Sequence, residues 1–254
     1  MRLSKRLETV ISFVKPGSRV ADVGTDHGFV PIELVLRKLA AGAVAMDVRP
    51  GPLGRAQEHI RQQGLEKEIE TRLGDGVERL DAKEADTVVI AGMGGPLVIH
   101  IMEQGRHLWE HVRHWILSPQ SELDKVRRFL HGNGFYIVRE EMVAEEEKYY
   151  TVIDARFGGD ELKGREEMTD MEYRYGPRLM EERNQVLLEY LEREKCQLAE
   201  IAEGLREKTG EKAAARRKEL EGRIQRIQMY CQAGARETPE TTGGLGDGLK
   251  AETR

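Results

Sequence analysis

The sequence is poor in cysteine and has no long apolar run. Its two cysteines, Cys196 and Cys231, cannot form a disulfide framework, which favours the reducing cytoplasm as the compartment. No apolar stretch approaches the ~20 residues that a membrane-spanning helix needs. The first residues are charged and lack the apolar segment of a secretory signal. We therefore expect a cytoplasmic protein without a membrane partner.

An excess of basic residues is also missing. The chain has 40 Lys and Arg against 45 Asp and Glu, a formal net charge of -5. This balance argues against a uniformly basic nucleic-acid-binding surface, so any nucleic acid would have to meet local basic patches. Lys5 and Arg6 form one candidate patch, and a C-terminal cluster containing Arg216 and Arg217 forms another. Glutamates interleave with the second cluster, so a solvated helix face is the alternative there.

Strand and helix patterns alternate through residues 1–159 and predict a doubly wound, Rossmann-like α/β domain. The expected strands lie at about 18–24, 43–46, 69–73, 85–91 and 114–117, followed by a hairpin over about 135–143 and 148–157. Sheets of this kind bind ligands at the carboxyl ends of their strands. Turns rich in Gly and Asp follow several of the expected strands at these ends.

A different pattern follows, and it predicts a helical domain over residues 160–233. Apolar positions step by four and three through about 183–207 and resume after a break at Thr209-Gly210, which predicts an antiparallel hairpin or coiled coil. The expected seams are Leu187, Leu191, Glu194, Leu198, Ile201 and Leu205, then Leu220, Ile224, Ile227 and Cys231. Residues 234–254 have almost nothing apolar to bury, and we predict a disordered tail.

The turn after the first strand has the pattern D-x-G-x-D-x-G, from Asp22 to Gly28. Its glycines would let the backbone approach a nucleotide-like ligand, and the following helix offers free N–H groups. The pattern differs from the G-x-G-x-x-G of dinucleotide sites and is closer to the adenosylmethionine-binding turn of class I methyltransferases. Asp47 ends the second strand 23 residues after Gly24, close to the spacing of about 20 that suits an acid bound to ribose hydroxyls.

Several motifs resemble the bacterial tRNA (adenine-22-N1)-methyltransferase family. They are Leu3-Ser4-Lys5-Arg6-Leu7, the turn from Ala21 to Gly28, Gly74-Asp75-Gly76, Ile90-Ala91-Gly92-Met93-Gly94-Gly95, Lys148-Tyr149-Tyr150 and Gly176-Pro177. The resemblance implies a class I methyltransferase domain, a C-terminal coiled coil, S-adenosyl-L-methionine as donor with S-adenosyl-L-homocysteine as product, and methylation of N1 of adenine 22 in the D-arm of tRNA. The chain departs from the family at Thr25, Phe29, Asp47 and Ser118-Pro119-Gln120.

The resemblance also assigns residues to the donor. Asp75 would bind the adenine amino group of the donor, and Asp47 would bind its ribose. Asp22 would orient the first turn, with a role in bracing that turn alone as the alternative. Asp75 could equally belong to a plain Gly-Asp-Gly turn. The expected cofactor-binding residues are Asp22, Gly24, Gly28, Asp47, Asp75, Gly76, Gly92 and Met93.

Asp26 and His27 are the candidate catalytic residues. Adenine N1 has a free lone pair at neutral pH, so placing it in line with the methyl group supplies most of the acceleration. Asp26 could stabilise the positive charge that moves to the methylated adenine, helped by His27, or it could only cap the next helix. The target base would have to leave its stack. The expected substrate-binding residues are Lys5, Arg6, Phe29, Gly94, Gly95, Gln120, Tyr150, Arg216 and Arg217.

Four histidines recur at intervals of seven, four and three residues: His100, His107, His111 and His114. On one helix they would share a face, but a strand is expected to begin near Trp115. We therefore expect no metal site and exposed histidines at helix ends. Two other functions stay open: a class I methyltransferase acting on another RNA, a protein or a small molecule, and a non-catalytic RNA-binding module on the same fold. We expect a monomer, with a dimer through the helical hairpin as the alternative.

Overall fold

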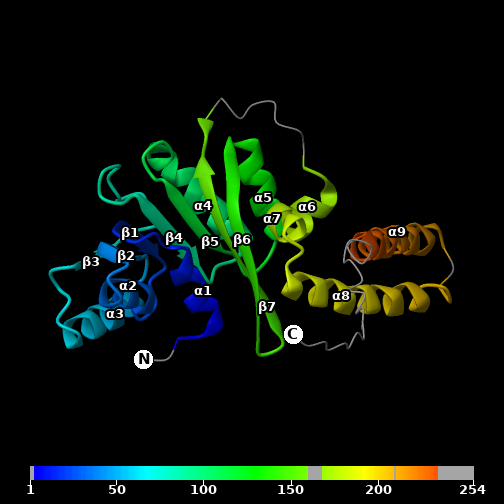
Figure 1. Cartoon of the computed structure of the whole chain (residues 1–254), viewed down its shortest axis with the longest axis horizontal. Helices are drawn as coiled ribbons and strands as arrows, with labels where there is room; N and C mark the ends of the chain where they lie inside the picture. Colours follow the sequence, from blue (N-terminus) through cyan, green and yellow to red (C-terminus); the bar gives the residue numbers. More distant parts are fainter. Residues whose placement is uncertain (1–2, 160–167, 209, 234–254) are drawn as a thin grey trace, which may run out of the picture. The chain divides into compact units, whose positions relative to one another are not determined.

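A seven-stranded mixed sheet forms the centre of the N-terminal unit in the computed structural model, which describes residues 3–159, 168–208 and 210–233 (Figure 1). The strand order is β3-β2-β1-β4-β5-β7-β6, with β1 to β5 parallel and β7 antiparallel to both of its neighbours. The strands are β1 (Ser18–Val23), β2 (Ala40–Asp47), β3 (Ile69–Leu73), β4 (Thr87–Ala91), β5 (His114–Ser118), β6 (Phe135–Glu145) and β7 (Lys148–Phe157). The predicted doubly wound sheet with a terminal hairpin is confirmed.

Helices cover both faces of this sheet. Successive residues of a strand point to opposite faces, so Val20 packs in one hydrophobic cluster with α1, α2 and α3, while Ala21 packs in the other with α4 and α5. The covering helices are α1 (Lys5–Phe13), α2 (Phe29–Leu36), α3 (Pro50–Gln62), α4 (Gly95–Gln104), the 3-10 turn η1 (Gly105–Leu108) and α5 (Leu123–Gly132). Because both faces are covered, the carboxyl edge of the parallel strands is left for a ligand.

Two short helices that the sequence patterns did not predict, α6 (Asp170–Tyr175) and α7 (Pro177–Glu181), attach to this unit through a buried ion pair. Arg127 of α5 and Glu140 of β6 are 1% and 0% exposed, and Arg127 Nε donates to Glu140 Oε1 at 2.8 Å. Arg127 also donates to the carbonyl oxygens of Tyr173 and Arg174, at 3.0 Å each. Removing either charge would leave its partner buried and uncompensated, so the pair fixes this connection to the sheet.

Compact packing divides the chain after Tyr190, within α8 (Gln185–Gly204), so α6 and α7 belong to the unit that contains the sheet. In the C-terminal unit, α8 and α9 (Glu211–Ala233) lie side by side (Figure 1), and Glu194 pairs with Arg223. Ile201 is 52% exposed, so its predicted place in the seam is wrong; Ala202, four residues after Leu198, is buried instead. The coiled-coil geometry stays a prediction, and the predicted disordered tail lies outside the described residues.

No helix in the described part of the chain is both long and apolar enough to cross a membrane.

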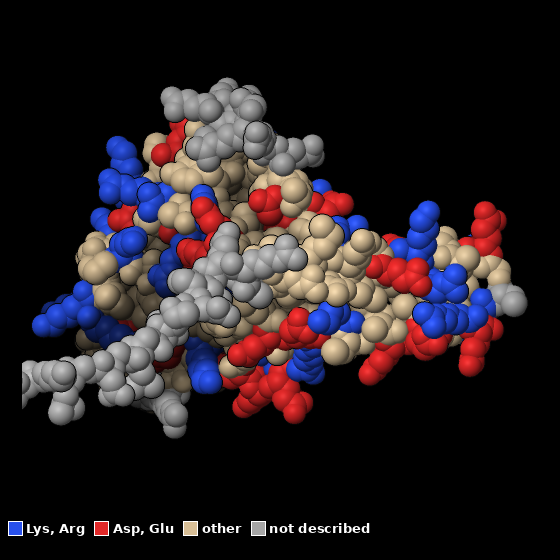
Figure 2. Space-filling model, turned by 45° about the vertical axis from the view of Figure 1, so that its right-hand side comes forward, with Lys and Arg blue, Asp and Glu red and all other residues tan. Residues whose placement is uncertain are grey.

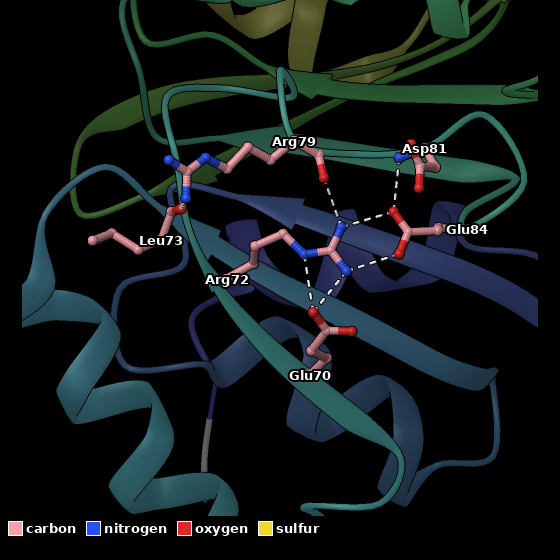
Figure 3. Close-up of polar contacts among 6 residues, drawn as sticks. All are labelled: Glu70, Arg72, Leu73, Arg79, Asp81 and Glu84. Atoms are coloured by element: carbon pink, nitrogen blue, oxygen red, sulfur yellow. Dashed lines mark hydrogen bonds and ion pairs between the residues drawn. The ribbon is translucent and has the colours of Figure 1, made fainter.

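A polar network ties the edge strand β3 to the loop that precedes β4 (Figure 3). Arg72 Nη1 and Nη2 donate to the two carboxylate oxygens of Glu84 at 2.7 and 2.8 Å, and Nη1 also donates to the carbonyl oxygen of Arg79 at 2.7 Å. Glu70 accepts from Arg72 Nε at 2.9 Å. This bidentate pairing of Arg72 with Glu84 fixes the geometry of the two side chains as well as neutralising their charges. The network therefore holds the loop that begins with Gly74-Asp75-Gly76.

Glu84→Gln is expected to lower the free energy of unfolding by about 1 kcal/mol at pH 7, measured by urea denaturation. Hydrogen bonds from Arg72, and from the backbone of Asp81, lower the pKa of Glu84 to about 2 from its ordinary value of 4.5. A lowered carboxyl pKa stabilises the fold above the ordinary value and loses that stabilisation as pH falls toward the folded value. The difference from wild type should therefore shrink between pH 5 and pH 3. Glu66→Gln, at an exposed site, is the matched control, and an equal loss in both variants would contradict the role of the network.

Candidate active site

A cavity of about 260 Å³ opens at the carboxyl edge of the parallel strands. Loops after β1, β2, β3 and β4 surround it, as the topology predicts for a doubly wound sheet. Six of the eight expected cofactor-binding residues line it: Gly24, Asp47, Asp75, Gly76, Gly92 and Met93. The other two do not line this cavity: Asp22 lies near the end of β1, and Gly28 lies directly before α2.

The turn after β1 is anchored to β2. The backbone N–H groups of Gly24 and Thr25 donate to the carbonyl oxygen of Met46 at 2.8 and 2.9 Å. Gly24 has φ +78°, and a Cβ there would come within 2.1 Å of Met93 Cε. Glycine is needed at this position because any side chain would be strained and would fill the space between the two loops.

Asp47 is a buried acid at the end of β2, 5% exposed, and it lines the cavity. Its Oδ1 accepts from the backbone N–H of Arg49 at 2.7 Å, and Arg49 Nε lies 3.6 Å away. These contacts fix the orientation of the carboxylate. A carboxylate held in this way can accept hydrogen bonds from the hydroxyls of a bound ribose.

Asp22 lies beneath the same turn and is 6% exposed. The pKa of Asp22 is raised to about 6 from 3.8, mainly by burial and to a smaller extent by the nearby Asp47 carboxylate, against an opposing effect of the Thr25 hydroxyl. Its position inside the β1 terminus agrees with the structural alternative, in which the acid braces the turn.

Asp22→Asn is expected to raise the free energy of unfolding at pH 7.5 by up to about 3 kcal/mol. A raised carboxyl pKa means that the fold favours the neutral acid, so the wild type loses stability as pH rises from about 4 through 6. The variant, which cannot ionise, should not show this loss. Urea denaturation of both proteins at pH 5 and pH 7.5 measures it, and a variant less stable at both pH values would show that the charged form is required.

The Gly74-Asp75-Gly76 loop packs against α4. Gly76 has φ +53°, and a Cβ there would lie 2.9 Å from Gln104 Oε1 and 3.2 Å from Ile101. Apolar side chains that the sequence patterns did not single out complete this wall of the cavity: Val48, Leu97 and Ile101. Val48 and Leu97 are 58% and 45% exposed and provide an apolar surface for a flat ring.

Asp26 and His27 lie beside the cavity and do not line it. Asp26 accepts from Arg55 Nη2 of α3 at 2.8 Å, and this hydrogen bond lowers the pKa of Asp26. His27 has φ +64° and stacks on Phe29, with ring centroids 5.1 Å apart. Arg55 was not predicted, because its contact with Asp26 depends on how α3 packs and leaves no local pattern.

Two of the expected substrate-binding residues, Arg6 and Gln120, meet over Gly92, and a third, Tyr150, lies beside Arg6. A Cβ on Gly92 would lie 3.5 Å from Arg6 Nη1 and 3.9 Å from Gln120 Nε2, and the Arg6 guanidinium lies 5.7 Å from the centre of the Tyr150 ring. Arg6 Nη1 is buried and has no hydrogen-bond partner among the described residues. The side-chain atoms nearest to Gly92 are the donor nitrogens of Arg6 and Gln120, which suits a ligand rich in acceptors.

The other expected substrate-binding residues lie elsewhere. A Cβ on Gly95 would come within 2.6 Å of the carbonyl oxygen of Ser121, so close packing requires that glycine, and Gly94 lies beside it against the Ser121 side chain. Lys5 is exposed at the start of α1. Arg216 and Arg217 belong to the C-terminal unit.

In that unit, α8 and α9 carry both signs of charge on the visible face (Figure 2). Arg216 pairs with Glu219 at 2.6 Å, and Arg217 with Glu221 at 3.6 Å. These contacts agree with the alternative of a solvated helix face.

The histidine expectation needs one correction. His114 is 8% exposed at the start of β5, and its Nδ1 lies 2.9 Å from Asp154 Oδ2. It is therefore a buried, paired side chain and not an exposed residue at a helix end. The other three lie on α4, in η1 and in the following turn, and no group of three metal-ligating side chains occurs within the residues that the structure describes.

The fold and the cavity at its edge are those of a class I methyltransferase, and comparison with known proteins agrees. The family model "Methyltransferase domain" matches residues 3–153. The tRNA (adenine(22)-N(1))-methyltransferase of Bacillus subtilis is 34% identical over 188 residues, which cover 74% of this chain and 79% of that protein. This chain belongs to the tRNA (adenine(22)-N1)-methyltransferase family.

Solved structures show the same likeness over more of the chain. The m1A22 tRNA methyltransferase TrmK of Bacillus subtilis has a TM-score of 0.80 at 31% identity, covering 91% of this chain and 99% of its own. A Streptococcus pneumoniae protein described as a candidate tRNA (m1A22) methyltransferase, in complex with S-adenosyl-L-methionine, has a TM-score of 0.78 at 32% identity. That comparison covers 91% of this chain and all of the other.

Proposed function

We propose that this protein transfers the methyl group of S-adenosyl-L-methionine to N1 of adenine 22 in the D-arm of tRNA. The observation that supports the proposal is the cavity lined by Gly24, Asp47 and Asp75, because this donor needs a close backbone approach and carboxylate acceptors. Family membership selects the substrate, because relatives named for this reaction match most of the chain.

The cavity fits the donor on its own chemistry. The left-handed turn at Gly24 supplies close backbone approach, the buried Asp47 carboxylate supplies acceptors for ribose hydroxyls, and Asp75 at the β3 end supplies one for an adenine amino group. Val48, Leu97 and Ile101 supply apolar contact. When bound, S-adenosyl-L-methionine supplies an electrophilic methyl group. We assign Gly28, Gly76, Gly92 and Met93 to the same site, with Asp22 bracing it.

The protein's own contribution to the reaction is positioning and charge. Adenine N1 needs no base, so the residues around Gly92 must hold the base in line with the methyl group. Gln120 is fixed for this task by its backbone N–H, which donates to the carbonyl oxygen of Met93 at 2.8 Å. Asp26, kept ionised by Arg55, is suited to offset the positive charge that appears on the methylated adenine.

We place Lys5, Arg6, Phe29, Gly94, Gly95 and Tyr150 on the tRNA side of this site, with His27 assisting Asp26. We further propose that residues 1–159 form the methyltransferase domain, that residues 160–233 add tRNA contacts through Arg216 and Arg217, and that the protein acts as a monomer in the cytoplasm. Because the net charge is -5, we expect the tRNA to be bound by small basic patches and not by a uniformly basic surface.

Labelled donor tests the proposal. We expect transfer to unmodified tRNA and none to the same tRNA with guanine at position 22. Transfer to neither would reject the proposed function, and equal transfer to both would reject only the target. A truncated protein ending at Gly159 should still bind S-adenosyl-L-homocysteine if the domain boundary is right, and it should methylate tRNA poorly.

A further inference from the structure

Helix α3 packs against the turn that precedes α2. Arg55, Ala56 and His59, which share one face of α3, each contact a different residue of the turn. Arg55 pairs with Asp26, and a Cβ on Gly28 would lie 3.2 Å from the Ala56 Cβ. His59 Nδ1 lies 2.9 Å from the carbonyl oxygen of His27, which holds His27 in its left-handed conformation.

These contacts bring together the rings of His27, Phe29 and His59, which we call the platform. Their centroids lie 5.1, 5.5 and 5.8 Å apart, and their planes differ by 9 to 19°. None of the three is buried, and the His27 side chain is 36% exposed. Near-parallel, partly exposed rings present a common π surface and not the interlocked edges of an apolar core.

The surroundings of the platform suit RNA. A second cavity, of about 250 Å³ between α2 and α3, is lined by Phe29 and His59. Its other walls combine apolar and amide side chains, namely Ile32, Leu36, Gln62 and Gln63, with Glu33. Arg55 and Arg49 lie nearby with side chains 48% and 69% exposed. Aromatic rings for stacking, amides for base edges and exposed guanidinium groups for phosphates are the means by which proteins bind unpaired nucleotides.

We propose that this platform stacks an unpaired nucleobase of the tRNA that neighbours the target adenine; the inference rests on the proposed function. We assign the platform to a neighbouring base and not to the target, because the cavity beside the platform and the donor cavity share no lining residue. The target N1 must approach the methyl group to about 3–3.5 Å, so the target base has to lie against the donor cavity. The platform is left for a different base, and His59 is the ring that α3 contributes to it.

Two variants and one control test the platform. His59→Asn keeps an amide nitrogen at the position of Nδ1, able to donate to the His27 carbonyl oxygen, but removes the ring. Phe29→Leu removes the second ring while keeping its apolar bulk. His111→Asn, the same change at an exposed turn residue before β5, is the control. We expect each platform variant to raise KM for tRNA about tenfold, with kcat within about twofold and S-adenosyl-L-homocysteine binding unchanged.

Position is read with 2-aminopurine placed singly at the target and at each neighbouring unpaired position of the D-arm. Fluorescence of a neighbouring 2-aminopurine should be quenched on binding wild type and should recover with His59→Asn. If wild type methylates tRNA but the platform variants change neither KM for tRNA nor the quenching, the inference alone is overturned. A response of the target position only would assign the platform to the target base and overturn it as well. Absence of transfer by wild type would overturn the proposed function, and the inference with it.

Discussion

Asp47→Asn should reduce the affinity for S-adenosyl-L-methionine by about 100-fold or more and reduce methyl transfer at limiting donor in proportion. The carboxylate is buried at the end of β2 and is held by the Arg49 backbone, so the substitution removes charge without changing shape. Two hydrogen bonds from ribose hydroxyls to a carboxylate contribute roughly 1.5–3 kcal/mol each. Asparagine is neutral and has one acceptor oxygen in place of two, so it weakens both hydrogen bonds, which accounts for an effect of this size.

Thermal stabilisation by S-adenosyl-L-homocysteine measures this loss directly. Asp81→Asn makes the same chemical change at an exposed position of the loop before β4 and should bind like wild type. A variant at Asp47 that keeps the full stabilisation would show that the ribose lies elsewhere, whatever its activity on tRNA. Loss of transfer with intact stabilisation would instead place Asp47 on the tRNA side.

The parts of this molecule that sequence predicts well are those set by local chemistry. The β strands alternate with amphipathic helices, and left-handed turns such as those at Gly24 and Gly76 demand glycine, so both leave a readable pattern. Asp47 could be assigned for the same reason, since it directly follows an apolar strand. The carboxyl-edge cavity then follows from the topology.

The parts that sequence misses depend on packing between distant segments. Arg55 and His59 look like ordinary polar residues of an exposed helix, and only the placement of α3 against the β1 turn brings them to Asp26 and His27. His114 was expected to be exposed but is buried. Its buried partner, Asp154, lies 40 residues away on a neighbouring strand, so no local pattern shows the pair. Helices of five or six residues, such as α6 and α7, are too short to show a helical period.

A similar limit applies in the C-terminal unit. Heptad spacing predicted Ile201 in the seam, but the buried position is Ala202, because the helix keeps a step of four after Leu198. Steps of three and four are both compatible with a helical face, and hydrophobicity alone favoured the larger residue. Only the packing of this unit decides between them.

Gly24→Ala should reduce donor affinity and methyl transfer by about 100-fold while lowering stability by only about 1–2 kcal/mol. The methyl group would project into the space between the β1 turn and Met93, 2.1 Å from Met93 Cε. Met93 is flexible and can move, but it then moves within the donor cavity that both residues line. The space lost is therefore space for the donor.

Gly17→Ala separates this effect from backbone strain. Gly17 has φ +84°, close to the +78° of Gly24, but a Cβ there meets nothing within 4 Å. Both variants should lose similar stability in urea denaturation, because the left-handed conformation penalises alanine equally. Only Gly24→Ala should lose stabilisation by S-adenosyl-L-homocysteine. Equal binding by the two variants would mean that strain alone requires glycine after β1, and that the donor does not pass close to this turn.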